Sequence, residues 1–169
     1  MAKTFIIGGL PLMANANEVQ FWIEKLRSEQ EEIRRAAIKK LIEIGRGAED
    51  PLINLLQDGN KYVRLGAVEV LAWISDSRVL ELLKPLLKDE YEWVRYAAVC
   101  ALERMDGPSV VPYLIDALTD EHTWVRYGAL CALAKIGDPR ARPFIEARLN
   151  DECEWIRRTA RQVLEKRSE

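Results

Sequence analysis

A four-residue pattern recurs along the chain: usually an aromatic residue, then Val or Ile, then Arg, then a variable residue. The copies are Tyr62-Val63-Arg64-Leu65, Trp93-Val94-Arg95-Tyr96, Trp124-Val125-Arg126-Tyr127 and Trp155-Ile156-Arg157-Arg158, with a plainer one at Glu32-Ile33-Arg34-Arg35. Counted from Ile33, the intervals are 30, 31, 31 and 31 residues. Such a period is typical of a solenoid, in which each unit is too small to bury its own apolar face and stacks on its neighbours.

The residues around each copy predict a helix with one apolar face. With the Val or Ile as position zero, positions zero, +4, +8 and +11 fall within one arc at 100° per residue. These positions are Ile33, Ala37, Leu41, Ile44; Val63, Ala67, Leu71, Ile74; Val94, Ala98, Leu102, Met105; and Val125, Ala129, Leu133, Ile136. Position +3 is always small, as Ala36, Gly66, Ala97, Gly128 or Thr159. Small residues there predict that neighbouring helices approach closely.

A second helix in each unit is predicted from apolar pairs spaced four residues apart. The pairs are Leu52 and Leu56, Leu83 and Leu87, Leu114 and Leu118, and Ile145 and Leu149. Asp138-Pro139 predicts the clearest helix start, because Asp accepts the first free amides and Pro fits the first turn. We therefore expect four helix pairs, over about residues 31–60, 61–91, 92–122 and 123–153.

Single capping helices are expected at both ends of the stack, over residues 17–28 and 154–167. Val19, Trp22, Ile23 and Leu26 form the apolar stripe of the first one. Residues 17–169 then make one domain, preceded by an irregular lead-in over residues 1–16. The lead-in imitates a short secretion signal, but its apolar part is brief and is broken by Gly-Gly and Pro.

Composition limits the classes of partner. The formal net charge is −2, the basic clusters lie near opposite ends, and acidic residues are interspersed, so we expect no nucleic-acid partner. No apolar run approaches the length of a membrane span. Three cysteines without close pairs do not make a disulfide framework, which favours a cytoplasmic location.

Further columns of the repeat identify a family. An Asp stands six residues before the Arg in four of the five copies, and in every copy Ala follows the Arg by three residues and Leu by seven. The Asp and Arg columns are Asp58 and Arg64, Asp89 and Arg95, Asp120 and Arg126, and Asp151 and Arg157. This pattern resembles HEAT repeats of the short phycobilisome-lyase-like type, although the opening unit has Ser28 where Asp is expected. The resemblance implies an all-α, right-handed, armadillo-like superhelix, with second helices on the concave side and the two columns forming a structural ladder between units.

Aromatic and small apolar side chains recur at positions where solvated helices usually carry charge. Positions −1, +2 and +6 of the middle units hold Tyr62, Leu65, Trp93, Tyr96, Cys100, Trp124, Tyr127 and Cys131, and Trp155 continues the first column. By the angular count, +2 and +6 lie opposite the core. A strip of this kind indicates a partner surface. Packing of the indoles on the preceding helix is the alternative, because position −1 precedes the first helical turn.

The sequence contains no recognisable catalytic set. His122 is the only histidine, which does not suffice for a multi-histidine metal site, and we expect it at the surface. Cys100 and Cys131 occupy equal places in adjacent units, too far apart for a disulfide, and are expected to stay reduced. We predict no catalytic residue, metal or cofactor.

These observations favour a non-catalytic scaffold that binds a protein partner through the strip, the concave side or both. Trp93, Tyr96, Trp124 and Tyr127 are the expected anchors. A bilin lyase subunit, or another factor that acts on phycobiliproteins, is the alternative that the resemblance implies. Self-association through the strip, giving a homodimer, is a third.

Overall fold

The computed structural model describes residues 16–74, 79–105 and 107–166. Most of the lead-in expected over residues 1–16, and the end of the last helix expected to reach residue 167, lie outside these residues. The first helices of the units are α2 (Glu31–Ile44), α4 (Lys61–Ile74), α6 (Glu92–Met105), α8 (Thr123–Ile136) and α10 (Glu154–Glu165). The helices that precede them are α1 (Ala16–Lys25), α3 (Glu49–Asn54), α5 (Leu80–Leu83), α7 (Val111–Ala117) and α9 (Arg142–Ala147).

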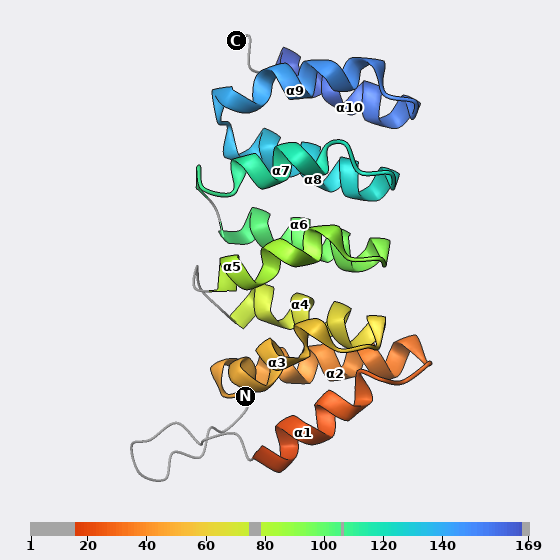
Figure 1. Ribbon diagram of the computed structural model, residues 1–169, viewed down its shortest axis with the longest axis vertical. Helices are drawn as coiled ribbons and strands as arrows, with labels where there is room; N and C mark the ends of the chain where they lie inside the picture. Colours follow the sequence, from red (N-terminus) through yellow and green to blue (C-terminus); the bar gives the residue numbers. More distant parts are fainter. Residues whose placement is uncertain (1–15, 75–78, 106, 167–169) are drawn as a thin grey trace, which may run out of the picture.

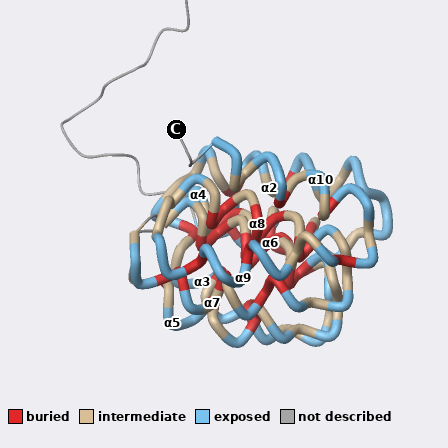
Figure 2. Tube along the Cα trace, turned by 90° about the horizontal axis from the view of Figure 1, so that it is seen from above, coloured by how far each residue is buried: buried red, intermediate tan, exposed pale blue. Residues whose placement is uncertain are grey.

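The helices form a stack of two layers with its two ends at opposite poles of the long axis (Figure 1). Seen from above, α2, α4, α6, α8 and α10 lie on one side, α3, α5, α7 and α9 lie on the other, and most buried residues lie between them (Figure 2). Consecutive first helices also contact one another, most extensively α4 with α6 and α6 with α8. The predicted all-α solenoid is confirmed.

Burial follows the repeat. Positions +4 and +8, as in Ala98 and Leu102, are fully buried in the units that begin with α2, α4, α6 and α8. The three middle helices bury additional residues at +5 and +7, such as Val99 and Ala101, because each is covered by a first helix on both sides. In α10 only Ile156 and Ala160 are buried, as expected for a terminal helix that meets water.

The small residues at position +3 lie where neighbouring units come closest. A Cβ added to Gly66 would stand 2.7 Å from Cδ2 of Leu26, and one added to Gly128 would stand 3.0 Å from Cε2 of Tyr96. Both distances are below ordinary van der Waals contact, so a larger side chain displaces its neighbour. The close approach inferred from the sequence is therefore present at these two junctions.

In three of the second helices, 3-10 turns replace part of the α-helix that the leucine spacing suggests. These turns are η2 (Leu55–Gln57) after α3, η4 (Lys84–Lys88) after α5 and η6 (Arg148–Asn150) after α9, while η1 (Gly45–Ala48) precedes α3 and η5 (Pro139–Ala141) precedes α9. Asp138 accepts a hydrogen bond from the Arg140 amide at 2.9 Å and so caps η5, as its sequence predicts. After α3, α5, α7 and α9 the chain turns at an Asp that lies three residues before the next first helix begins.

Candidate functional site

Three arginines each form a bidentate pair with a carboxylate of the following unit, and we call each such pair a fork. In Arg64, Arg95 and Arg126, Nε and Nη2 donate to the two carboxylate oxygens of an Asp 25 residues further on. The acceptors are Asp89, Asp120 and Asp151, with distances between 2.8 and 3.0 Å. Parallel charge-assisted bonds of this kind fix both distance and angle, so each fork aligns two units.

The same arginines are held by their own unit. Nη1 of each donates to the backbone oxygen of the Asp six residues earlier, at 2.9 Å in all three. Nη2 also reaches the Glu that follows the bound Asp, namely Glu90, Glu121 or Glu152, at 3.1 Å. Each Asp carboxylate in turn accepts an amide hydrogen bond from two residues on, as Asp120 does from His122 at 2.8 Å. The ladder therefore shapes the turns as well as joining the units.

The last fork is the most deeply buried of the three. The side chains of Arg126 and Asp151 are only 4% and 2% exposed. Burial on its own would raise the pKa of the Asp151 carboxyl, but the hydrogen bonds from Arg126 and the Cys153 amide, with the charges of Arg126 and Arg148, hold that pKa below its ordinary value. Asp151 is accordingly ionised and paired at neutral pH.

The first junction departs from this scheme. Arg34 donates Nη1 to the Ser28 and Glu29 oxygens at 2.8 Å, like the later arginines, but its guanidinium lies 4.0 Å from the Tyr62 ring centre. Asp58 is bound instead by Arg27, two residues after α1 ends, with distances of 3.1 and 2.6 Å. The hydrogen bonds from Arg27 lower the pKa of Asp58. The sequence did not indicate Arg27 as a ladder residue.

Aromatic rings form a row along the edge where the first helices begin, and we call it the aromatic row. Its members are Tyr62, Tyr91, Trp93, Tyr96, His122, Trp124, Tyr127 and Trp155. Each junction has its own contact: Tyr62 meets Tyr91 edge-on at 6.2 Å, Trp93 meets His122 at 5.7 Å, and Tyr127 stacks on Trp155 at 4.1 Å. Despite these contacts Trp93, Trp124 and Trp155 remain 37%, 42% and 40% exposed.

The strip residues at positions +2 and +6 are less exposed than the angular count suggests. Leu65, Tyr96, Cys100, Tyr127 and Cys131 are all half-buried. They lie in seams between consecutive first helices, where Tyr96 covers Gly128 of the next unit. Burial, assisted by interaction with Cys100, raises the pKa of Tyr96 to about 12, and burial also raises the pKa of the Cys100 and Cys131 thiols. Their main contribution is to packing, whereas the indoles at position −1 are exposed.

Two members of the row were not expected from the sequence. His122 was expected to be a surface residue, but it is half-buried because its ring packs against Trp93. Tyr91 was not singled out at all. Both stand three residues before position zero and two residues after the ladder Asp. This shared position in the repeat is the sequence signal that could have placed them in the row.

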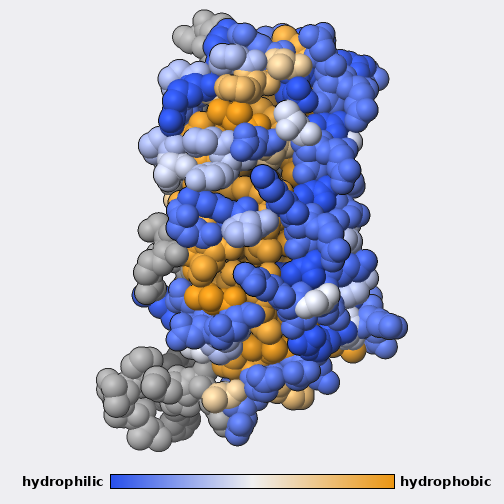
Figure 3. All heavy atoms as spheres, in the orientation of Figure 1, coloured by the Kyte–Doolittle hydropathy of each residue, from blue (hydrophilic) through white to orange (hydrophobic). Residues whose placement is uncertain are grey.

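The opposite layer carries a separate apolar surface. An apolar band flanked by hydrophilic residues runs along the face formed by the second helices (Figure 3). Leu82 on α5 and Phe144 on α9 are 41% and 48% exposed. A groove of about 670 Å³ between η4 and α7 is lined by Pro85, Leu87, Ala117 and Tyr113, with Lys84 over the Tyr113 ring.

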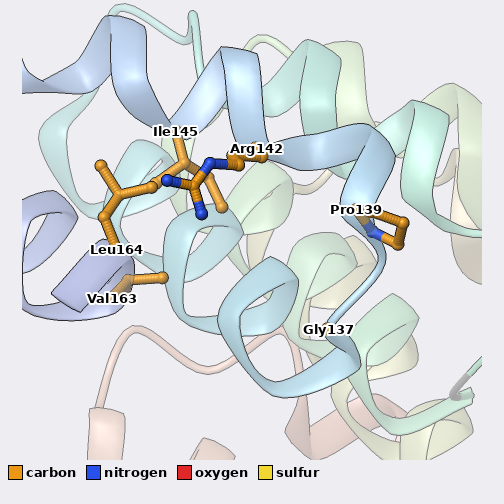
Figure 4. Close-up of a pocket in the computed structure, with 6 residues that line it drawn as sticks. All are labelled: Gly137, Pro139, Arg142, Ile145, Val163 and Leu164. Atoms are coloured by element: carbon orange, nitrogen blue, oxygen red, sulfur yellow. The ribbon is translucent and has the colours of Figure 1, made fainter. Parts of the chain in front are cut away.

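A smaller pocket of about 430 Å³ lies near the end of the stack, between the loop after α8, α9 and α10. Figure 4 shows the Arg142 side chain beside Ile145 and Leu164, with Val163 nearby and Gly137 and Pro139 further along. Its lining is apolar apart from Arg142. Across residues 16–74, 79–105 and 107–166, no group of three or more His, Cys, Asp or Glu side chains is placed to hold a metal ion. Within the same ranges no helix has the length and apolar character needed to span a membrane.

Comparison with known families agrees with this geometry. A family model described as HEAT repeats matches residues 19–103 and 83–165. The chain belongs to the HEAT-repeat family. The two overlapping matches of this HEAT-repeat protein include all three forks and the aromatic row. No curated protein matches the chain.

Solved structures share the fold of this HEAT-repeat protein at low sequence identity. The complex of CpcE and CpcF of phycocyanin lyase from Nostoc sp. PCC7120 has a chain similar over 89% of this one and 99% of its own length, with a TM-score of 0.78 and 19% identity. YibA of Escherichia coli is 26% identical, with a TM-score of 0.70, over 92% and 62% of the two chains. A designed armadillo repeat protein in complex with peptide (KR)4 is 22% identical, with a TM-score of 0.60, over 90% and 87%.

Proposed function

We propose that this HEAT-repeat protein is a non-catalytic scaffold that binds a protein partner along the aromatic row. The observation that supports this proposal is the exposure of Trp93, Trp124 and Trp155 on a frame that the Asp–Arg forks hold in register. Trp, Tyr and Arg are the residues that most often dominate the binding energy of protein interfaces. Here the three indoles are kept in fixed orientations by their ring contacts, so binding immobilises little that is not already ordered.

The half-buried residues of the strip predicted from the sequence are poor probes of binding. Replacing Tyr96 or Tyr127 removes packing between units, so a loss of binding would follow from a damaged fold as well as from a lost contact. Trp93 and Trp124 are better probes because their exposed surfaces are available to a partner. Trp73 is 60% exposed at the end of α4, outside the row, and Arg104 stacks on its ring at 3.5 Å. It provides a matched control for the loss of an exposed indole.

The test compares the intact chain, Trp93→Ala/Trp124→Ala and Trp73→Ala in affinity capture from the source organism, with helicity checked by circular dichroism. Captured proteins are identified by mass spectrometry and their Kd is then measured with purified partner. We expect a partner that binds the intact chain and the Trp73 variant alike and binds the double variant at least about a hundredfold more weakly.

Equal binding by all three forms would overturn the role of the row. The apolar surface of the second helices would then be tested with Leu82→Glu and Phe144→Glu, which place a charge at exposed positions of the other layer. Homodimerisation through the row has its own readout, a concentration-dependent mass in sedimentation that the double Trp variant abolishes.

A second candidate is a factor that acts on phycobiliproteins. It is favoured by the similarity to a chain of the phycocyanin lyase complex over 99% of that chain. At 19% identity this similarity supports a shared fold and assigns no residue to bilin chemistry. Co-expression with a phycocyanin acceptor and a bilin supply tests it: new covalent bilin absorbance on the acceptor would support this candidate, and an unmodified acceptor would exclude it.

A further inference from the structure

Arg157 occupies the Arg column of the last unit, and its own unit holds it as the earlier arginines are held. Its Nη1 donates to the backbone oxygens of Asp151 and Glu152 at 2.7 and 2.9 Å. Arg126 makes the equivalent bonds to Asp120 and Glu121 at 2.9 and 3.0 Å. The guanidinium of Arg157 is therefore oriented in advance, as in the three forks.

Arg157 differs from the other arginines at the Nε and Nη2 edge of its guanidinium. In Arg64, Arg95 and Arg126, Nε and Nη2 bind the Asp of the next unit, and Nη2 also binds the Glu after it. Among residues 16–74, 79–105 and 107–166, no carboxylate forms an ion pair with Arg157. A bidentate donor for a carboxylate thus lies on α10, the last first helix among the described residues.

The three internal examples define the chemistry of an occupant. Each bound carboxylate belongs to an Asp-Glu pair in the turn before a first helix: Asp89-Glu90, Asp120-Glu121 and Asp151-Glu152. The exposed side chains of α10 beside Arg157 include Arg158 and Arg161, in contrast to the Tyr at the position equivalent to Arg158 in α6 and α8. This end therefore suits an acidic, polar surface better than the apolar contact of an internal junction.

A second copy of this chain is a poor occupant. The start of its stack has Ser28 in place of the ladder Asp, and its first ladder carboxylate, Asp58, is already bound by Arg27. We propose that Arg157 binds the Asp-Glu turn at the start of a repeat unit carried by a different protein, so that the solenoid continues across the interface. This inference rests on the proposed role in protein binding, but it uses residues outside the part of the aromatic row probed above.

The test uses a synthetic peptide with the sequence of residues 150–166 and Cys153→Ser, which carries one Asp-Glu turn and the helix after it. Its matched control has Asp151→Asn. Binding to the full chain is followed by NMR at the Arg157 Nε–H signal, which is assigned by its absence from Arg157→Lys, and at the backbone amide signals of α10, which also report on variants that lack Arg157. We expect saturable shifts with the first peptide, about tenfold or more weaker binding of the Asn peptide, and a similar loss in Arg157→Gln protein.

Two further variants make the result specific. Arg35→Gln removes an exposed arginine of α2, at the opposite end of the stack, and should leave Kd within about twofold. Trp93→Ala/Trp124→Ala should bind the peptide normally whatever the fate of the aromatic row. No shift of the Arg157 signal at millimolar peptide, or equal binding by Arg157→Gln, would overturn the proposal. Salt-sensitive dimerisation of the chain alone that Arg157→Gln abolishes would also overturn it, because the occupant would then be a second copy.

Discussion

The first junction of the stack and the three later ones use the same residue types with different connections. At the later junctions one arginine joins its own turn to the next unit, through a fork that is almost fully buried at Arg126 and Asp151. At the first junction these tasks are divided: Arg34 binds its own turn and stacks on Tyr62, while Arg27 binds Asp58 with a side chain that is 41% exposed.

The difference separates two parts of the arginine's role. Binding to the turn depends only on residues within one unit, and it survives at both ends, in Arg34 and in Arg157. Binding to the next unit depends on spacing, because 25 residues separate each forked pair, whereas Arg34 and Asp58 are 24 apart. The shortened first unit thus coincides with the one junction where a neighbouring helix supplies the arginine.

The largest predicted effect contrasts the two kinds of ion pair. Arg126→Ala leaves the Asp151 carboxylate buried without its fork and is expected to lower the free energy of unfolding by about 3–5 kcal/mol. Arg27→Ala removes an exposed arginine from a pair that water can solvate, so its expected loss is about 0–1 kcal/mol. Urea denaturation followed by circular dichroism measures both. Similar losses for the two variants would show that burial does not distinguish the junctions.

The small column offers a second contrast. Gly128→Leu forces a side chain against Tyr96 and Val99 and is expected to destabilise the protein by about 1–3 kcal/mol. Ala36 occupies the same position in the first unit but is exposed, so Ala36→Leu should change stability by less than about 0.5 kcal/mol. A loss of similar size at Ala36 would contradict the view that position +3 matters only where a neighbouring unit covers it.

Features that depend on one helix were predictable from the sequence, and features that depend on neighbours were less so. The 3.6-residue period placed Ala98 and Leu102 in the core, and Asp138-Pro139 marked a helix start. The same period placed Cys100 opposite the core, yet a first helix in mid-stack has neighbours on both flanks, so that position is half-buried. An angular count on one helix has no information about what lies beside it.

The ladder and the aromatic row show the same limit. A column of Asp and a column of Arg are visible in the sequence, but the partner of each Arg is decided by the stacking of units. Arg27 lies in no such column, and only its position in the turn after α1 brings it to Asp58. Which surface binds a partner stays a prediction, because exposure of Trp93 and of Leu82 on opposite layers gives two candidates.

Acid unfolding distinguishes the two ends through their carboxylates. The pKa of Asp151 and that of Asp58 are both lowered in the folded protein, so each contributes stability above the ordinary Asp value of about 3.9 that is lost as pH falls below it. Asp151→Asn is expected to lower stability by roughly 1.5–3 kcal/mol at pH 7 and to flatten the loss between about pH 4 and 2. Asp58→Asn should change the stability at pH 7 and the acid-induced loss less than Asp151→Asn does, because Arg27 is exposed. Denaturation curves over this pH range would show an unchanged acid slope for Asp151→Asn if its pairing did not matter.

The smallest expected effect is a gain in stability from a substitution at the first junction. Glu69 takes the column position that Cys100 and Cys131 hold later, and burial raises the pKa of its carboxyl, opposed by the charge of Arg35. A carboxyl whose pKa is raised by folding loses stability as pH rises from its unfolded value of about 4.3 through its folded value. Glu69→Gln should therefore stabilise the protein at pH 7 by roughly 0.5–1 kcal/mol, and the two forms should converge near pH 3, where both side chains are neutral. Lower stability of the Gln variant at pH 7 would instead show that the attraction of Arg35 outweighs burial, and that the first junction relies on exposed charge pairs at more than Arg27.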